Sequence, residues 1–578
     1  MRGTRSLRAC VLAASLLAAA SCTQGGAQPK SQNLAEDQTL RFAISDDVGS
    51  LDPAQIYSSA DLQVAQNLFD GLVRYDKSLN IVPDLAVALP TSTPDQMTYT
   101  FKLRPDATFS NGDRVTSRDV LYSWNRAAVT QGPYATDLSA VAGFQRLSLQ
   151  PPAPDKLEQL LATNDPSVRL QGLSAPDDST VVVKLARAAG SFLSGLALPG
   201  GVGMVVDQKV VQKNPEGWWT KPESLVGTGP YRMSGRTPGQ TMEFQAVGTW
   251  SGTPRPTIQK VHIDVISDAA AREQRYEEGR YDLNGFGGSS VLTQGDLARI
   301  KTSDLAKELV LQPGISSTWV NFNLVHDAAR IGGGPFLDSL GQPARDLRLA
   351  FALAVDKKKL TAAVCGGALC SPATGGLVPK GLKGYAGDGS DPLAAFDAGR
   401  AQALLKSADP NGSRTKGLFF VYDAESPLFR AVAENLRQQW ELNLGVQVDI
   451  APVAHQQLLM DVRSGKYPLS RVGWQAHIDH PTDWYDNLFG KAAGCPDLNC
   501  DSGYDTPLFD QLVSQADSKA LPDSLPLYQQ IGQMLSAETA YIPLFYSVRA
   551  YMIKPYVKGA GANNLLEFGW DEYRILEH

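Results

Sequence analysis

Hydrophobic and polar residues alternate along this chain with two different periods, and together they predict strands that alternate with helices. Residues 39–45 and 261–266 alternate with the period of two that is typical of a half-buried strand. Residues 61–69 and 117–126 place apolar side chains at helical spacing instead, with Ser117 as the expected helix cap. In a chain of 578 residues, this alternation predicts an α/β fold with enough material for two lobes.

A short apolar run near the N-terminus predicts an export signal. Residues 9–20 follow a positively charged start and are too few to span a bilayer as a permanent helix. The run ends in small residues directly before Cys22, which resembles a bacterial lipobox. We therefore expect residues 1–21 to be a signal peptide and Cys22 to be lipidated. An ordinary secretory signal that merely contains a cysteine is the alternative.

The segment after the lipobox has the composition of a tether. Residues 22–38 are rich in Gln, Gly, Ser and Lys and contain few large apolar side chains, so we expect a flexible linker. Beyond it, no apolar run approaches the length of a membrane span. We predict an extracytoplasmic protein of the cell envelope that contacts the cell membrane through its N-terminal lipid alone.

The overall composition argues against one class of partner. The chain is 43% hydrophobic and 20% charged, as in ordinary globular proteins, and its formal net charge is −7. Phosphate binding needs a concentrated basic surface, whereas this sequence has no long run of Lys and Arg. We expect no nucleic acid partner.

Four cysteines remain after the signal and the lipid site, and they form two C-x4-C pairs. Cys365 and Cys370 enclose two glycines, while Cys495 and Cys500 enclose a proline. Residues five apart on a helix point to different faces, so each pair predicts a tight non-helical loop. An even count in an exported chain predicts two short-range disulfides. A four-cysteine metal site is the alternative, although such sites usually show C-x2-C spacing.

The sequence contains no recognisable catalytic pattern. The adjacent carboxylates at 46–47 and 177–178 lie near Gly or Pro in turns, where aspartates commonly hydrogen-bond their own backbone. No G-x-S-x-G elbow, H-E-x-x-H pair or P-loop occurs. We expect neither enzymatic activity nor a cofactor.

Residues 471–489 have an unusual composition. They combine two tryptophans, a tyrosine, two histidines, an arginine and three aspartates around one proline, a mixture that suits neither a plain core strand nor an amphipathic helix. Large apolar faces beside a few oriented polar groups are typical of a small-molecule pocket. A surface loop anchored by its aromatic residues is the alternative.

A series of motifs in one order points to a family. The N-terminal half contains G-x-LDP, DGLV-x-Y, P-x-LA, TFKLRPDATFSNGD and then a helix with DV-x-x-S-W-x-R. Later landmarks are GTGPY at 227–231, WVNFN at 319–323 and IPLFY at 542–546. The series resembles family 5 of the solute-binding proteins, the dipeptide- and oligopeptide-binding proteins of ABC importers. It extends from about residue 39 to the C-terminus.

The resemblance implies an architecture and a function. The expected fold is a two-lobed α/β periplasmic-binding-protein-like fold of type II, in the large cluster with an extra subdomain in lobe I. Lobe I should comprise residues 39–315 with 548–578, and lobe II residues 316–547. Such a monomer captures a small ligand, above all a short peptide, by hinge closure and delivers it to ABC permease subunits. The alternatives are a sensor or envelope-biosynthesis regulator with the same fold, and a binder of a sugar, metal complex or haem.

The resemblance also implies a ligand site on lobe II. In peptide-binding members an acid three positions after a tryptophan pairs with the ligand's ammonium, but here Trp474 is followed by His477. Either Asp479 or Asp483 substitutes, or the ligand has no free amine. Arg471 resembles a position that contacts the peptide's carboxylate. The expected ligand-binding residues are Trp319, Asn321, Arg471, Trp474, His477, Asp479, Asp483, Trp484 and Tyr485.

The histidines and aspartates of this segment also suit several transition metals. Pro481, however, interrupts any helix that would stack His477 with a later ligand. Histidines near tryptophans more often hydrogen-bond or stack. We therefore expect no metal site.

Overall fold

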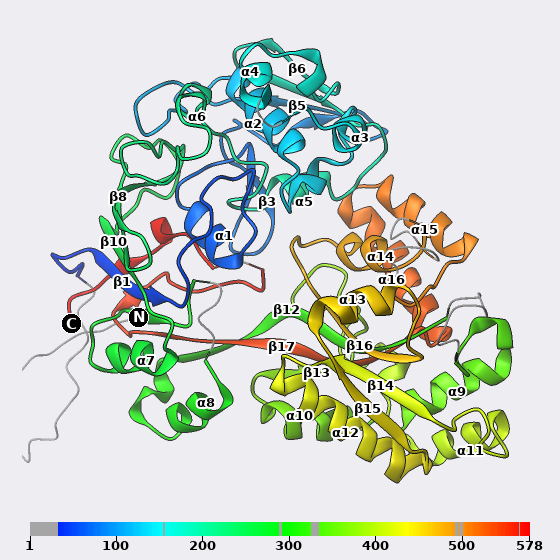
Figure 1. The fold of residues 1–578 in the computed structure, drawn as a ribbon. Helices are drawn as coiled ribbons and strands as arrows, with labels where there is room; N and C mark the ends of the chain where they lie inside the picture. The colour runs from blue at the N-terminus through cyan, green and yellow to red at the C-terminus, as the bar shows by residue number, and fades with distance from the viewer. Residues whose placement is uncertain are drawn as a thin grey trace, which may run out of the picture.

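Two lobes joined by a pair of long strands make up the fold (Figure 1). The computed structural model describes residues 33–153, 156–287, 292–324, 334–491, 495, 501–565 and 567–578. Strands β12 (Leu309–Phe322) and β17 (Tyr541–Ile553) pair antiparallel and run from one lobe into the other. Sheets and helices occur in both lobes, so the predicted two-lobed α/β fold is confirmed.

The ladder between β12 and β17 is interrupted midway. Its register shifts between residues 313 and 317, where the amide of Ser316 donates to Ser547 Oγ at 3.1 Å. Such a bulge bends a strand and increases its local twist. The expected lobe boundaries at 315/316 and 547/548 lie at this irregularity, and they stay a prediction.

A seven-stranded mixed sheet carries lobe II and reaches into lobe I. Its order is β11-β17-β12-β16-β14-β15, with β13 paired to β17. The remaining strands are β11 (Leu283–Asn284), β13 (Cys370–Pro372), β14 (Leu418–Asp423), β15 (Val448–Val453) and β16 (Leu469–Gln475). The helices packed around it are α9 (Gln342–Leu353), α10 (Lys357–Cys365), α11 (Ala398–Ala408), α12 (Pro427–Leu444), α13 (His455–Arg463), α14 (Thr482–Leu488), α15 (Pro507–Asp517) and α16 (Leu521–Ala537).

Lobe I is built on smaller sheets. One has the order β1-β10-β9-β8, with β1 parallel to β10, and short β2-β3 and β18-β19 pairs lie beside it. These strands are β1 (Thr39–Ile44), β2 (Val73–Tyr75), β3 (Ile81–Pro83), β8 (Tyr231–Thr237), β9 (Thr241–Ala246), β10 (Lys260–Val265), β18 (Val557–Lys558) and β19 (Arg574–Ile575). The helices are α1 (Ser59–Ala65), α5 (Phe192–Leu196), α6 (Gln208–Lys213), α7 (Ala269–Glu277) and α8 (Gln294–Lys301).

A separate four-stranded sheet with its own helices forms the outer part of lobe I, at the top of Figure 1. Its order is β4-β5-β7-β6, and the long helix α2 contacts both β6 and β7. The elements are β4 (Thr91–Ser92), β5 (Thr98–Lys102), β6 (Leu173–Asp177), β7 (Thr180–Lys184), α2 (Ser117–Thr130), α3 (Phe144–Leu149) and α4 (Leu157–Ala162). This arrangement agrees with the extra subdomain expected in lobe I.

Local sequence signals explain several boundaries. The strands predicted at 39–45 and 261–266 are β1 and β10, which pair with each other. Helix α2 forms where the pattern predicted it, but Ser117 is its first residue and the cap is Thr116. Asp119 accepts a hydrogen bond from the Thr116 amide at 2.8 Å, which completes a capping box.

The first described residues contact the end of the chain. Leu34 bridges Leu576, and Gln38 Nε2 donates to the carbonyl of Ile575 at 2.8 Å. Residues 33–38, predicted as part of the tether, therefore pack on lobe I. The signal peptide, Cys22 and the rest of the tether lie outside the described residues.

Cys365 and Cys370 form a disulfide, as their spacing predicts. Cys365 ends α10, the loop turns through Gly366 and Gly367 at φ 58° and 62°, and Cys370 starts β13. The loop is thus tight and non-helical. Cys495 is also disulfide-bonded. Its predicted partner, Cys500, lies outside the described residues.

Candidate ligand-binding site

A cavity of about 480 Å³ lies where the two lobes meet. Pro133, Tyr134 and Thr136 line it from lobe I, and Arg471, Trp474 and His477 line it from lobe II. A volume of a few hundred cubic ångströms suits a small-molecule ligand. The three lobe II residues belong to the set expected from the sequence.

The segment 471–489 is regular at both ends. Its first residues belong to β16, a central strand between β12 and β14, and its last turn is α14, which begins directly after Pro481. The expectation that it suits neither a strand nor a helix was wrong, because the segment changes from one element to the other. Proline is well tolerated at a helix start, where its missing N–H breaks no hydrogen bond. The loop between the two elements carries His477 and Asp479.

His477 lies between two carboxylates from different lobes. Its Nδ1 is 2.8 Å from Asp483 Oδ1, and its Nε2 is 3.1 Å from Asp137 Oδ1. A carboxylate offers only acceptors, so both ring nitrogens donate and the ring is an imidazolium. Burial alone would lower the pKa of His477, but the charges and hydrogen bonds of Asp483 and Asp137 hold it well above its usual value. His477 is therefore a cation that bridges the lobes.

Asp483 organises the loop around His477. It is fully buried and accepts hydrogen bonds from the His477 amide at 2.8 Å, from Trp474 Nε1 at 3.2 Å and from Asn487 Nδ2 at 3.1 Å. The Ile478 amide donates at 3.4 Å, and His477 Nδ1 brings the contacts to five. The protein itself supplies donors to both oxygens of Asp483, which holds the loop together and does not line the cavity.

Arg471 carries a largely buried guanidinium with unused donors. It lies on β16 and stacks on Phe429, with its guanidinium carbon 3.6 Å from the ring centroid. It faces Asp423 at 3.6 Å, but it donates no hydrogen bond to any residue that the structure describes, and its Nε is buried without a partner. Burial lowers the pKa of Arg471 to about 10. An arginine with open donors in a cavity is suited to a carboxylate, which it binds with two parallel bonds.

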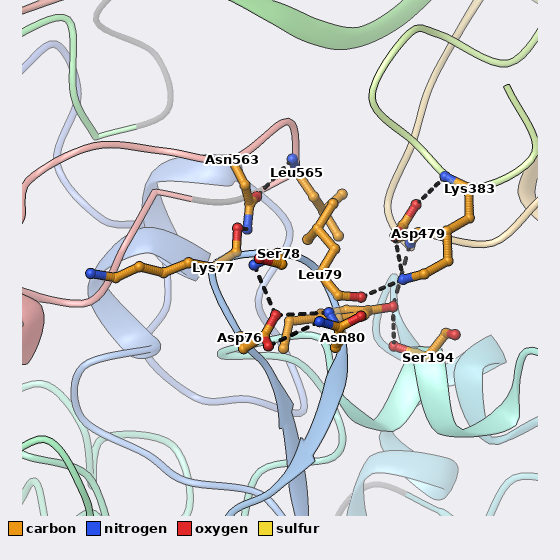
Figure 2. Close-up of polar contacts among 11 residues, drawn as sticks. Asp76, Lys77, Ser78, Leu79, Asn80, Ser194, Lys383, Asp479, Asn563 and Leu565 are labelled. Atoms are coloured by element: carbon orange, nitrogen blue, oxygen red, sulfur yellow. Dashed lines mark hydrogen bonds and ion pairs between the residues drawn. The ribbon is translucent and has the colours of Figure 1, made fainter. Parts of the chain in front are cut away.

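A second contact between the lobes joins Lys383 of lobe II, which also pairs with Asp479 of the same lobe, to Leu79 of lobe I (Figure 2). Asp479 is 1% exposed and accepts from the Lys383 amide and from its ammonium, each at 2.7 Å. The same ammonium donates to the carbonyl of Leu79, in the turn between β2 and β3 of lobe I. Leu79 has φ 60°, a left-handed conformation that is uncommon for leucine. Asp479 is thus already paired with an ammonium of the protein.

The other expected site residues lie in the core and do not line the cavity. Trp319 and Trp484 are 1% and 0% exposed, and Trp484 Nε1 donates to Ser317 Oγ at 3.2 Å. Tyr485 is buried and stacks on Tyr528. Large aromatic side chains are as typical of cores as of pockets.

Asn321 is also buried, and it holds in place a residue that lines the cavity. Its Nδ2 donates to the carbonyl of Asp501, which lines the cavity. Burial raises the pKa of Asp501 to about 6, against the opposing charges of Arg463 and Arg471. Asn321 therefore positions a lining residue and makes no contact with the cavity itself.

Sequence reasoning missed the residues that come from elsewhere in the chain. Asp137 and Tyr134 of lobe I lie about 340 positions from His477, and Lys383 lies 96 positions from Asp479. A lone aspartate or lysine in a polar loop carries no signal of such a contact. His455, at the start of α13, also lines the cavity.

The described part of the chain contains no group of three or more His, Cys, Asp or Glu side chains that could hold a metal ion. The carboxylates beside His477 lie against opposite ring nitrogens, so the three side chains do not converge on one point. Among the same residues, no helix is both long and apolar enough to cross a membrane.

Two lobes, a connecting strand pair and a cavity between them define a binding protein of the periplasmic type. The model of the bacterial extracellular solute-binding proteins, family 5, middle region, matches residues 80–494. Because this match spans more than half of the chain, the protein belongs to that family, and the resemblance found in its motifs is confirmed.

Individual relatives align along almost the whole length. The chain is 25% identical to the periplasmic oligopeptide-binding protein OppA of Salmonella typhimurium, over 96% of this chain and 95% of OppA. It is 24% identical to the periplasmic murein peptide-binding protein MppA of Escherichia coli, over 98% and 97%. It is 26% identical to the probable deoxycholate-binding periplasmic protein YgiS of Escherichia coli, over 93% of each. A solved structure of MppA in its unliganded open form superposes with a TM-score of 0.78 at 22% identity, covering 95% and 99% of the two chains.

Proposed function

We propose that this protein captures a short peptide or a peptide-like solute between its lobes, outside the cytoplasm, and delivers it to the permease subunits of an ABC importer. The observation that carries the proposal is the cavity between residues 133–136 of lobe I and residues 471–477 of lobe II. A ligand there contacts both lobes, so its binding energy favours the closed arrangement. OppA and MppA, named for peptide binding, support the peptide class.

The lining supplies two kinds of contact. Trp474 and Tyr134 offer aromatic faces from opposite lobes, and Arg471 offers open donors for a carboxylate. The side chains of Leu458 and Val462 add an apolar wall. This combination suits a compact organic acid with apolar groups, such as a short peptide.

A carboxylate-bearing solute that is not a peptide is the second candidate. The open donors of Arg471 favour it as strongly as they favour a peptide, and YgiS is named as a probable deoxycholate-binding protein. The two candidates differ in whether backbone amides of the ligand are recognised.

The lipid anchor forms a further part of the proposal. Cleavage before Cys22 and lipidation of that residue would hold a monomer on the outer side of the cell membrane. Membrane fractionation of the full chain and of Cys22→Ala tests this. Release of the variant into the soluble fraction is expected, and equal membrane association of both proteins contradicts it.

The binding proposal is tested by native mass spectrometry of the protein purified without denaturation, combined with thermal shift in a mixture of tripeptides. We expect a bound mass or a raised melting temperature, which Arg471→Met abolishes. Arg430→Met is the matched control, because Arg430 forms an exposed ion pair with Glu434 in the same lobe. If peptides have no effect while a bile acid raises the melting temperature, the non-peptide candidate is correct.

A further inference from the structure

Two charged side chains that line the cavity have open polar atoms, and their charges are opposite. Arg471 donates no hydrogen bond to a described residue, and the carboxylate of Asp501 accepts none from the same part of the chain. The one described cation within 4 Å of that carboxylate is Arg463, whose Nε lies 3.9 Å from Oδ1, which is too far for a hydrogen bond. A cavity that presents an open cation and an open anion suits a ligand that carries both charges.

The backbone holds Asp501 at the Arg471 end of the cavity. The carbonyl of Asp501 accepts a hydrogen bond from Asn321 Nδ2 at 2.6 Å. Asn321 pairs across the sheet with Ser470, the neighbour of Arg471. Accordingly, the charges that act on the Asp501 carboxylate are those of Arg463 and Arg471. The open anion and the open cation therefore lie in the same part of the cavity.

The other carboxylates near the loop do not line the cavity. Asp479 pairs with the ammonium of Lys383, and Asp483 takes up donors from the loop itself. Asp137 directs one oxygen at His477, and its other oxygen is buried. Because the single imidazolium of His477 faces two carboxylates, it adds no spare positive charge that would repel a cationic ligand.

We infer, on the basis of the proposed function, that Asp501 binds the ammonium group of the ligand, at the Arg471 end of the cavity and not beside His477. An ammonium there gains a charge-assisted hydrogen bond from a carboxylate that has none. The carboxylate of the same ligand neutralises Arg471, which removes the repulsion from that side. Arg463 has a side chain that is 43% exposed, so its own charge stays in water.

The pKa of Asp501 supports this assignment. Burial raises the pKa to about 6, and the opposing charges of Arg463 and Arg471 do not offset the burial. The carboxylate is therefore ionised at neutral pH, yet the protein compensates its charge incompletely. A buried charge without a full partner is costly, and a ligand ammonium supplies that partner.

The test uses single tripeptides that contain no Lys, Arg or His. Each is titrated by calorimetry into the full-length protein, alongside its N-acetylated form. Acetylation removes the only ammonium of the probe and leaves its carboxylate for Arg471. We expect every tripeptide that binds to do so at least about tenfold more tightly than its acetylated form, because a hydrogen bond between charged groups is lost on acetylation.

Asp501→Asn removes the charge and keeps the shape of the side chain. Free-amine peptides should lose most of their preference in this variant, whereas acetylated peptides should keep or gain affinity. Asp510→Asn is the matched control, because Asp510 on α15 also has a cation at a long distance, Lys491 Nζ at 3.8 Å, and does not line the cavity. We expect the control to leave the preference unchanged. Circular dichroism confirms that each variant is folded.

A second variant should move the preference in the opposite direction, which a folding defect does not do. In Arg463→Met, Asp501 loses the described cation that lies 3.9 Å away, so a ligand ammonium meets less repulsion. We expect the preference for free-amine peptides to widen. A preference that narrows or stays the same contradicts the pairing of Asp501 with the ligand.

The remaining outcomes are distinct. If the wild type binds acetylated peptides as tightly as free-amine peptides, the inference fails and the proposed peptide function stands. If Asp501→Asn keeps the preference, or weakens both forms equally, Asp501 does not bind the ammonium and the inference is overturned. If no peptide of either form binds the wild type, the proposed peptide function fails, and the inference with it.

Discussion

His477 Nε2 lies 3.1 Å from Asp137 Oδ1, although the two residues are 340 positions apart in the chain and belong to different lobes. The other ring nitrogen contacts Asp483 at 2.8 Å within lobe II. One imidazolium therefore holds a lobe I carboxylate against the lobe II loop that borders the cavity. The contact makes the approach of the lobes dependent on a titratable group.

The first prediction concerns alkaline pH. The pKa of His477 is raised above its ordinary value of 6.5, so its stabilising contribution is fully present below 6.5 and is lost as the pH rises through the folded-state pKa. We expect the melting temperature of the wild type to fall more steeply than that of His477→Gln between neutral and alkaline pH. In Asp137→Asn the decline in melting temperature should begin at lower pH, because only Asp483 is left to raise the pKa of His477. Parallel curves for all three proteins would contradict the bridge.

The second prediction concerns acid pH and has the opposite sign. Burial lowers the pKa of His480 to about 3, and its Nδ1 accepts a hydrogen bond from the Thr482 amide at 3.2 Å. A depressed pKa gives a contribution that is present above 6.5 and is lost as the pH falls. At two pH units below 6.5, the free energy of unfolding has fallen by about 3 kcal/mol. His480→Asn keeps an acceptor for Thr482 and should flatten the decline in melting temperature on the acid side. An unchanged slope would show that His480 is not responsible.

The third prediction concerns Lys383. Its ammonium contacts Asp479 within lobe II and the carbonyl of Leu79 in lobe I, so Lys383→Met removes the contact between the lobes and leaves a buried carboxylate without its cation. We expect the closed arrangement to lose about 2 kcal/mol, the usual contribution of a hydrogen bond to a charged group. Small-angle scattering should then show a larger radius of gyration. Lys380→Met is the matched control, because Lys380 pairs with Asp388 on the surface. Equal radii for the two variants would contradict an interlobe role of Lys383.

The fourth prediction concerns the disulfide between Cys365 and Cys370, which closes a short loop between α10 and β13. Loop-closure entropy for so few residues gives a contribution of about 2 kcal/mol to lobe II. Urea unfolding of the Cys365→Ala, Cys370→Ala double variant should show this loss. A midpoint equal to that of the wild type would mean that the cross-link contributes nothing to stability.

The sequence predicted those parts of the fold that depend on local pattern. Strands β1 and β10 follow from alternation, and the disulfide loop follows from the spacing of Cys365 and Cys370 together with the glycines between them. The order of motifs identified the family. Arg471, Trp474 and His477, predicted from one short segment of unusual composition, line the cavity, and their contact with a ligand stays a prediction.

The rest of the site depends on contacts over long distances in the sequence. Nothing in the local sequence shows that Asp137 meets His477, or that Lys383 occupies Asp479. The same limit explains Trp484 and Tyr485, which were expected to touch ligand and instead pack in the core. Burial depends on which elements surround a side chain, and an aromatic residue has the same composition signal in either place.

The central claim is that the open donors of Arg471 hold a ligand carboxylate in the cavity between the lobes. It is tested most directly by calorimetric titration of the wild type with N-acetylated tripeptides and with the same peptides amidated at the C-terminus. Loss of a buried charge partner typically costs a few kcal/mol. We therefore predict that the acids bind at least about tenfold more tightly than the amides. Equal affinity for acids and amides would contradict the account.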